Sequence, residues 1–354
     1  MPEHAFSGEP ITSRRGFFWV GLERTAHAAG TTLRGPMYVQ WEAPVEVRHP
    51  YPIVLIHGGG GQGTDYLGTP DGRPGWATFL VQEGYAVYVV DRPGHGRAAL
   101  HPDLLGAMTP PFTYEFAHWL FMPPPDGPAS HPTSHLHTQW PGTGPEDAVA
   151  DQLIAGTGPM IADFAAAHAL EQARGAELLD LIGPAILVTH SAGGPTAWLT
   201  ADARPDLVKA LVAIETMGPP FFENPAMGLS LDWGLAAAPL TFDPPASDPS
   251  ELARETHELP EPGRPPMILQ AEPARRLPNL ARFPIAVVTA EASPFVHFDD
   301  HTVEFLRQAG CDVERVRLAD HGVHGNGHGM MMEKNNREAL GVILDWLGRR
   351  VPAA

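Results

Sequence analysis

The chain has 354 residues, of which 43% are hydrophobic and 18% are charged. This composition supports a large buried core and excludes a largely disordered chain, and the length is that of roughly two average domains. Lys and Arg number 23 against 41 Asp and Glu, so the formal net charge of −18 disfavours binding to nucleic acid or to an anionic membrane surface.

Cysteine content and hydropathy further narrow the class of protein to which this chain can belong. Cys311 is the only cysteine, which excludes an intrachain disulfide and a cysteine-based metal site. Residues 1–10 are polar and lack the apolar core of a signal peptide, and no apolar stretch reaches the length of a transmembrane helix. We therefore expect a soluble, cytoplasmic protein.

Strand and helix patterns alternate along most of the chain. Segments 17–21 and 37–43 predict an N-terminal hairpin, and apolar runs at 53–57 and 86–91 flank a helical pattern at 76–83. Further apolar runs typical of buried strands lie at 185–189, 210–215, 285–289 and 313–318. Helical patterns between and after them lie at 161–181, 192–203, 301–309 and 333–349. The alternation predicts an α/β fold, with a mostly parallel, doubly wound sheet and helices on both of its faces.

Two long intervals interrupt this alternation and are rich in proline and aromatic residues. They are residues 98–146 and 218–282, and loops of this length in a compact domain are usually lids or binding segments. We predict that they form a cap, although surface loops packed by their own aromatic residues are the alternative. Residues 1–50 then supply the N-terminal strands, and the α/β core would comprise 51–97, 147–217 and 283–354.

The most specific local pattern is a buried strand that runs directly into His190-Ser191-Ala192-Gly193-Gly194 and then into a helix. This is the G-x-S-x-G turn that presents a nucleophilic serine, with Thr189 in place of the first glycine. Small neighbours permit the sharp reversal, and the helix N-terminus favours an anion beside the serine. The alternative is a serine that only caps the helix.

A glycine-rich segment, His57-Gly58-Gly59-Gly60-Gly61, ends the first core strand. Without side chains, its backbone N–H groups can approach a substrate oxygen closely. We predict that the amides of Gly59 and Ala192 form an oxyanion hole, with the first assignment uncertain by one position. A phosphate-binding loop is excluded because G-x-x-x-x-G-K-[ST] is absent here.

A nucleophilic serine needs a base, and residues 320–329 contain His321, His324 and His328 after the last predicted strand. The residues leave His324 and His328 both open as the base. Three histidines in one loop also suggest a metal, but a glycine-rich loop rarely presets a tetrahedral site. The histidines at 131, 135 and 137 have a spacing that a metal site could use, but a solvated loop is the better interpretation.

The acid that orients the base has two main candidates. Glu215 closes an apolar strand, where burial of a carboxylate is costly unless it is paired. Glu291 follows another strand, and Asp299 and Asp300 are weaker options because they fit the first turn of a helix. These arguments favour Glu215.

Taken together, these motifs resemble the α/β-hydrolase superfamily. The resemblance is carried by residues 57–60, the segment Asp-Arg-Pro-Gly-His-Gly-Arg at 91–97, the Ser191 turn, the C-terminal histidine loop and the order nucleophile, acid, histidine. Residues 214–221 and 324–336 are similar to a bacterial esterase group whose acid is a Glu after the strand following the nucleophile. By this resemblance the triad is Ser191, Glu215 and His328, and Glu291 lies outside it.

The predicted function is hydrolysis of a carboxylic ester or lactone through an acyl-enzyme, without a metal or organic cofactor. The partner is a small-molecule ester or lactone with an apolar or aromatic group, which suits an aromatic cap. Alternatives are a catalytically silent binding protein, and acyl transfer, C–C bond hydrolysis or lyase chemistry on the same fold. A homodimer is also expected, because the N-terminal hairpin and the cap offer apolar surface.

Overall fold

A single eight-stranded sheet organises the chain. The computed structural model describes residues 10–98, 100–123, 131–260 and 264–351. In spatial order the strands are β1 (Ser13–Val20), β4 (Met37–Pro44), β6 (Val87–Asp91), β5 (Ile53–Ile56), β7 (Ala185–His190), β8 (Val208–Ile214), β13 (Ile285–Thr289) and β14 (Val313–Arg317). β1 and β4 run antiparallel to their neighbours, and the six strands from β6 to β14 are parallel.

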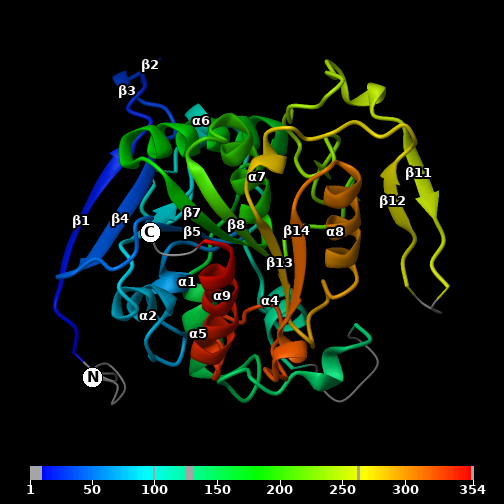
Figure 1. The fold of residues 1–354 in the computed structure, drawn as a ribbon. Helices are drawn as coiled ribbons and strands as arrows, with labels where there is room; N and C mark the ends of the chain where they lie inside the picture. The colour runs from blue at the N-terminus through cyan, green and yellow to red at the C-terminus, as the bar shows by residue number, and fades with distance from the viewer. Residues whose placement is uncertain (1–9, 99, 124–130, 261–263, 352–354) are drawn as a thin grey trace.

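Helices cover both faces of this sheet, as Figure 1 shows. Successive strand residues point to opposite faces, so Ile53 and Leu55 of β5 belong to one core cluster and Val54 and Ile56 to the other. The first cluster packs under α2 (Trp76–Gln82) and α9 (Asn336–Arg350). The second packs under α6 (Phe164–Ile182), α7 (Gly194–Ala203) and α8 (Phe298–Gln308). Burial on both faces explains why the parallel strands are continuously apolar.

The predicted α/β fold class is confirmed. Each predicted core strand and each of the helices expected between them is present, within a few residues of the expected bounds. The predicted N-terminal hairpin is the β1–β4 pair, but a small second hairpin, β2 (Arg24–His27) with β3 (Gly30–Leu33), lies between its strands. The sequence did not indicate that insertion, because its exposed strands lack an apolar period.

Where the structure describes them, the two long intervals contain only short elements. The first holds α3 (Pro102–Leu105), α4 (Tyr114–Phe121) and a 3₁₀ turn at Ser134–Leu136, and α5 (Ala148–Ala155) follows it. The second holds two hairpins, β9 (Glu223–Asn224) with β10 (Leu229–Ser230) and β11 (Arg254–His257) with β12 (Met267–Gln270). Figure 1 shows β11 and β12 at the right-hand margin, beyond α8. The assignment of the two long intervals to a cap remains a prediction.

The remaining short elements are α1 (Thr64–Leu67) and 3₁₀ turns at Ser191–Gly193, Pro249–Glu251, Leu280–Arg282 and Leu318–His321. Within the residues that the structure describes, no helix combines the length and the hydropathy needed to cross a membrane. Cys311 is buried in the turn between α8 and β14.

Candidate active site

Ser191 stands on a strained turn between β7 and α7. Its φ is 51°, in the left-handed region that non-glycine residues rarely adopt. A Cβ on Gly193 would lie 2.4 Å from the backbone oxygen of His57, and one on Gly194 would lie 2.6 Å from Cβ of Thr216. The turn therefore requires glycine at both positions, as the motif predicted.

The Ser191 hydroxyl does not cap a helix, because neither the 3₁₀ turn nor α7 has a side-chain cap. Thr189, which replaces the first glycine of the motif, is fully buried beneath the turn. Its Oγ1 would be 2.8 Å from a Cβ on Gly193, so the threonine side chain fills space under the turn without blocking it.

Glu215 and His328 form a buried pair. His328 Nδ1 lies 2.7 Å from Glu215 Oε2, and both side chains are fully buried. Glu215 follows β8 with a φ of 44°, another left-handed residue at the end of a parallel strand. Its Oε1 accepts the N–H of Ala290 at 2.7 Å, and its Oε2 accepts the hydroxyl of Ser293 at 2.7 Å. Three donors thus converge on one carboxylate.

The imidazole of His328 also packs against two neighbouring rings. Phe295 stacks on it with centroids 4.5 Å apart, and the ring of His190 lies 4.4 Å away. His190, the residue before Ser191, donates from Nε2 to the backbone oxygen of His328 at 2.9 Å. Nε2 of His328 is buried and makes no hydrogen bond to any described residue. Glu215 thus engages Nδ1 of His328 and leaves Nε2 unpaired among the described residues.

Burial controls the protonation of this pair. It lowers the pKa of His328 to about 3, so the imidazole is neutral at neutral pH. Burial raises the pKa of Glu215, and the hydrogen bonds from Ala290 and Ser293 act in the opposite direction.

The alternative residues form a second His–Glu pair. His324 Nδ1 lies 3.2 Å from Glu291 Oε1, and Glu291 Oε2 accepts the N–H of Gly325 at 3.0 Å. The His324 side chain is 61% exposed. This pair therefore lies at the surface, whereas His328 and Glu215 are enclosed.

The two aspartates weighed as acids have other partners. Both lie in the first turn of α8, as expected. Asp299 accepts the hydroxyl of Thr289 at 2.6 Å, and Asp300 forms ion pairs with Arg264 and Arg315. Burial, reinforced by the charge of Glu215, holds the pKa of Asp299 well above its usual range.

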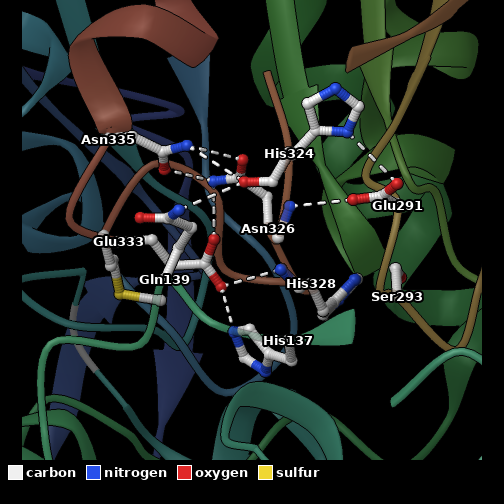
Figure 2. A network of polar contacts seen from close by, with 12 residues as sticks. His137, Gln139, Glu291, Ser293, His324, Asn326, His328, Glu333 and Asn335 are labelled. Carbon is white, nitrogen blue, oxygen red and sulfur yellow. Dashed lines mark hydrogen bonds and ion pairs between the residues drawn. The ribbon is translucent and has the colours of Figure 1, made fainter. Parts of the chain in front are cut away.

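Glu333 anchors the loop that carries His328. Its Oε1 lies 2.7 Å from Nε2 of His137 and accepts the N–H of Gly327 at 2.9 Å, and its Oε2 accepts Asn326 Nδ2 at 2.7 Å. Figure 2 shows these contacts on one side of the loop and the His324–Glu291 pair on the other. A Cβ on Gly327 would lie 2.7 Å from the His137 ring, so glycine permits this approach.

Hydrogen bonds from buried side chains hold the backbone of the glycine-rich loop. The backbone oxygen of Gly58 accepts Nη2 of Arg92 at 2.8 Å and Nδ1 of His57 at 2.8 Å. Arg92 also forms a buried ion pair with Glu171 at 2.8 Å. The peptide bond between Gly58 and Gly59 is trans, so the N–H of Gly59 points away from this oxygen. That N–H makes no hydrogen bond to the described residues.

Gly59 and Ala192 lie side by side at a cavity of about 800 Å³ that Ser191 also lines. A Cβ on Gly59 would lie 3.0 Å from Cβ of Ala192. Both residues thus lie at the cavity that Ser191 lines, and their role as an oxyanion hole stays a prediction. Large apolar side chains form much of the wall, among them Phe112, Phe116, Trp119, Met160, Met217 and Phe222.

The histidines at 131, 135 and 137 have separate partners. His131 lines the cavity, His137 pairs with Glu333, and His135 contacts the backbone oxygen of Pro132. Among the described residues, no group of three or more His, Cys, Asp and Glu is arranged to hold a metal ion.

Sequence reasoning missed Arg92, Ser293 and Glu333. Arg92 directly follows the buried β6, a position where a charged side chain faces the end of the sheet. Ser293 and Glu333 have no sequence pattern of their own, because their partners are distant in the chain. Ser293 is 78 residues from Glu215, and Glu333 is 196 residues from His137.

Comparisons with known proteins agree with this fold. A profile of the family described as alpha/beta hydrolase fold matches residues 51–245. The chain belongs to the α/β-hydrolase fold family. It is 39% identical over 351 residues to a protein named "Probable secreted lipase phiG" from Fungal sp. (strain ATCC 74256), with 97% of this chain and 91% of that protein covered.

A solved structure has the same fold over nearly the whole chain. The structure of a novel bacterial esterase has a TM-score of 0.68 and 23% identity, and the match covers 97% of this chain and 98% of that one. The name of the fungal relative describes that protein as secreted. This is at odds with the cytoplasmic location expected above, which stays a prediction.

Proposed function

We propose that this protein is a serine hydrolase that cleaves carboxylic esters through an acyl-enzyme. One observation carries the proposal: Ser191 lies on a strained turn at an apolar cavity, directly after His190, whose ring packs on His328. His328 has one nitrogen paired with Glu215 and the other buried and unpaired. These contacts support the proposed roles of Ser191 as nucleophile, His328 as base and Glu215 as orienting acid in acyl transfer.

In the proposed reaction, Oγ of Ser191 attacks the ester carbonyl and Nε2 of His328 takes the hydroxyl proton. Glu215 holds Nδ1 and stabilises the imidazolium that forms. The tetrahedral intermediate collapses, and the imidazolium gives its proton to the departing alcohol. A water molecule then repeats these steps on the acyl-enzyme, releases the acid and restores Ser191.

The amides of Gly59 and Ala192 would hold the oxyanion of each tetrahedral intermediate. The hydrogen bonds from Arg92 and His57 to Gly58 fix the Gly59 N–H before substrate binds. Such preorganisation avoids reorganising the loop during the reaction, and one donor of this kind contributes about 3 kcal/mol.

The cavity supports an apolar or aromatic acyl or alcohol group in the substrate. Its wall includes Phe112 and Trp119 from the first long interval and Phe222 and Met227 from the second. Contributions from both intervals support the proposal that they act as a cap over Ser191. The name of the fungal relative, a lipase, agrees with an apolar ester substrate.

The test combines labelling with turnover. The wild-type protein should react with a fluorophosphonate probe and hydrolyse p-nitrophenyl esters, and Ser191→Ala should do neither while keeping the wild-type circular dichroism spectrum. Substitution of His328 by alanine should abolish turnover, whereas His324→Ala should retain it.

The outcomes separate the alternatives. Labelling without turnover of any ester or lactone would favour acyl transfer or lyase chemistry. Absence of both labelling and turnover would favour a binding protein, and loss of activity in His324→Ala alone would show that the base is misassigned.

A further inference from the structure

Ser293 is a fully buried serine that contacts the candidate acid and the segment that packs on the candidate base. It follows β13, and Glu215 directly follows the neighbouring strand β8. The Ser293 hydroxyl donates to Glu215 Oε2 at 2.7 Å, and the same oxygen lies 2.7 Å from Nδ1 of His328. That hydroxyl also accepts the N–H of Phe295 at 3.0 Å, and the Phe295 ring stacks on the His328 imidazole. One side chain thus contacts the acid directly and the base through Phe295.

The direction of these hydrogen bonds follows from the groups that make them. An ionised carboxylate can only accept, so the single hydroxyl proton of Ser293 goes to Glu215. The backbone N–H of Phe295 can only donate, so the hydroxyl oxygen accepts there. The backbone oxygen of Ser293 accepts the hydroxyl of Thr133 at 3.1 Å, which ties the serine to the first long interval. Ser293 is therefore held with its proton directed at the acid.

The Glu215 carboxylate depends on this donor because it is fully buried. Its Oε1 accepts the N–H of Ala290, so without Ser293 its Oε2 would keep only the imidazole of His328. A buried charged group that loses a hydrogen-bond donor is destabilised more than an exposed one. Burial raises the pKa of Glu215, and the hydrogen bond from Ser293 opposes that effect because it favours the ionised form.

We propose that Ser293 is a positioning residue whose hydroxyl fixes the Glu215 carboxylate in the orientation that meets Nδ1 of His328. The inference rests on the proposed ester hydrolysis and adds to it a residue that acts through the acid. In that reaction the acid stabilises the imidazolium only while it is ionised and aligned with the ring. Ser293 therefore supports kcat without touching the substrate.

Other titratable groups also face Glu215, and the tests below leave them unchanged. They come from the C-terminal segment, the first long interval and α8, and they are His328, Glu333, His137 and Asp299. Among the effects on the pKa of Glu215, burial is the largest, the charge of Glu333 raises the pKa and that of His137 lowers it. Because substitutions at Ser293 keep all of these groups, a change in the pH profile reports the lost donor.

The test measures hydrolysis of p-nitrophenyl butyrate by Ser293→Ala over a range of pH. Loss of a hydrogen bond to a charged group should lower kcat by about 10- to 100-fold, with little change in KM. The acid limb of the kcat/KM profile should move to higher pH by about one pH unit, because the Glu215–His328 pair binds a proton more tightly without the donor. A merely structural role would lower activity without moving that limb.

Two single variants keep the test interpretable. Ser293→Cys retains a weak donor of similar size, so its kcat and its acid limb should lie between those of the wild type and Ser293→Ala. It also supplies the comparison if circular dichroism shows that the alanine variant does not fold. Ser13 donates to Glu42 Oε1 at 2.5 Å between β1 and β4. Ser13→Ala removes the same type of hydrogen bond there, and its kcat and pH profile should match the wild type.

A double-mutant cycle tests whether Ser293 acts through the acid. If it does, Ser293→Ala should cause little further loss of kcat in a protein that already carries Glu215→Gln, because the carboxylate that it positions is gone.

The inference is overturned if the Ser293 variants keep the wild-type kcat and pH profile, or if they lose activity while the acid limb stays in place. Losses that multiply in the Ser293→Ala, Glu215→Gln double variant would also overturn it. Failure of the proposed function is a separate result, because it would appear as turnover of p-nitrophenyl butyrate by Ser191→Ala.

Discussion

At the scale of single residues, two residues of the candidate site have a strained backbone. Ser191 and Glu215 each adopt a left-handed φ directly after neighbouring parallel strands. Such conformations cost about 1–3 kcal/mol each and persist where the surrounding structure enforces them. Both residues thus lie at the same edge of the sheet, where Glu215 pairs with His328 from the far end of the chain.

The sequence indicated Ser191 through its motif, but the residues alone did not decide between two His–Glu combinations. Glu215 and Glu291 both follow apolar strands, and His324 and His328 share one loop. What separates the pairs is burial, since one pair is enclosed and the other is at the surface. Burial depends on Phe295 and Phe121, which pack on His328 from segments distant in sequence.

The two pairs give a matched experiment. In Glu215→Gln the imidazole of His328 loses the carboxylate that orients it, so kcat should fall by about 10³- to 10⁴-fold. Glu291→Gln makes the same chemical change in the exposed pair and should leave kcat near the wild-type value. Steady-state kinetics with one p-nitrophenyl ester measures both. Equal losses in the two variants would contradict the assignment of the acid.

At the scale of elements, buried polar side chains hold both the histidine loop and the glycine-rich loop in place. Glu333 and His137 hold the histidine loop, and the Arg92–Glu171 pair holds the glycine-rich loop. The sequence predicted the loops but not these supports. A buried ion pair between β6 and α6 leaves no local pattern, because its members are 79 residues apart.

Removing the charge of Glu333 should loosen the histidine loop. In Glu333→Gln, the N–H of Gly327 or the ring of His137 loses an acceptor, so the free energy of unfolding should fall by about 1–3 kcal/mol. We also expect a lower kcat, because His328 lies in the same loop. Urea unfolding and steady-state kinetics measure these changes, and the exposed Glu258→Gln serves as the control. Wild-type values of both quantities would show that Glu333 does not support the loop.

Two helical glycines should respond in opposite directions to alanine. A Cβ on Gly341 of α9 meets no atom within 4 Å, so Gly341→Ala should stabilise the protein by about 1 kcal/mol through helix propensity. A Cβ on Gly175 of α6 would lie 1.9 Å from Thr200 Oγ1 of α7, so Gly175→Ala should destabilise it. Thermal unfolding of both variants tests this, and a shift of the same sign in both would refute the packing described between α6 and α7.

The regular core was easier to predict than its insertions, for a physical reason. Core strands such as β5 and β7 are apolar throughout because helices cover both faces. The strands of the β11–β12 hairpin follow no such rule, since β11 is exposed along its whole length. Their pairing depends on local contacts that composition does not reveal.

At the scale of the whole molecule, many histidines are held neutral in the interior. In the described part of the chain, burial lowers the pKa of His57, His95, His131, His168, His190, His301 and His328. Burial raises the pKa of fewer carboxyls, namely Asp65, Asp202, Glu215 and Asp299. A histidine with a lowered pKa takes up a proton on unfolding, and a carboxyl with a raised pKa releases one.

Acid should therefore destabilise the protein in the range where these histidines titrate when unfolded. Between about pH 6.5 and pH 4.5 the unfolded chain binds more protons than the folded chain, so the free energy of unfolding should decrease as the pH falls. Urea unfolding at a series of pH values measures this dependence. A free energy of unfolding that rises toward acid would show that the buried carboxyls outweigh the histidines.

His168 isolates one contribution outside the candidate site. Its Nδ1 accepts the N–H of Ala237 at 3.0 Å, and burial lowers its pKa to about 3. In His168→Gln this proton uptake is lost, so the dependence of unfolding free energy on pH should flatten by up to about 1.4 kcal/mol per pH unit. The slope is compared with the wild type between pH 5 and 6, and an unchanged slope would contradict the account.

The Arg92–Glu171 pair has a consequence for engineering. Because the orientation of the Gly59 amide is set from beneath the loop, it does not depend on the side chains that a ligand would touch. For the proposed hydrolase, we expect libraries that randomise Phe112, Trp119 or Phe222 to alter chain-length and ring selectivity without removing the support beneath this amide. The scaffold separates the choice of ligand from the chemistry performed on it, which makes it a tractable starting point for tailored biocatalysts.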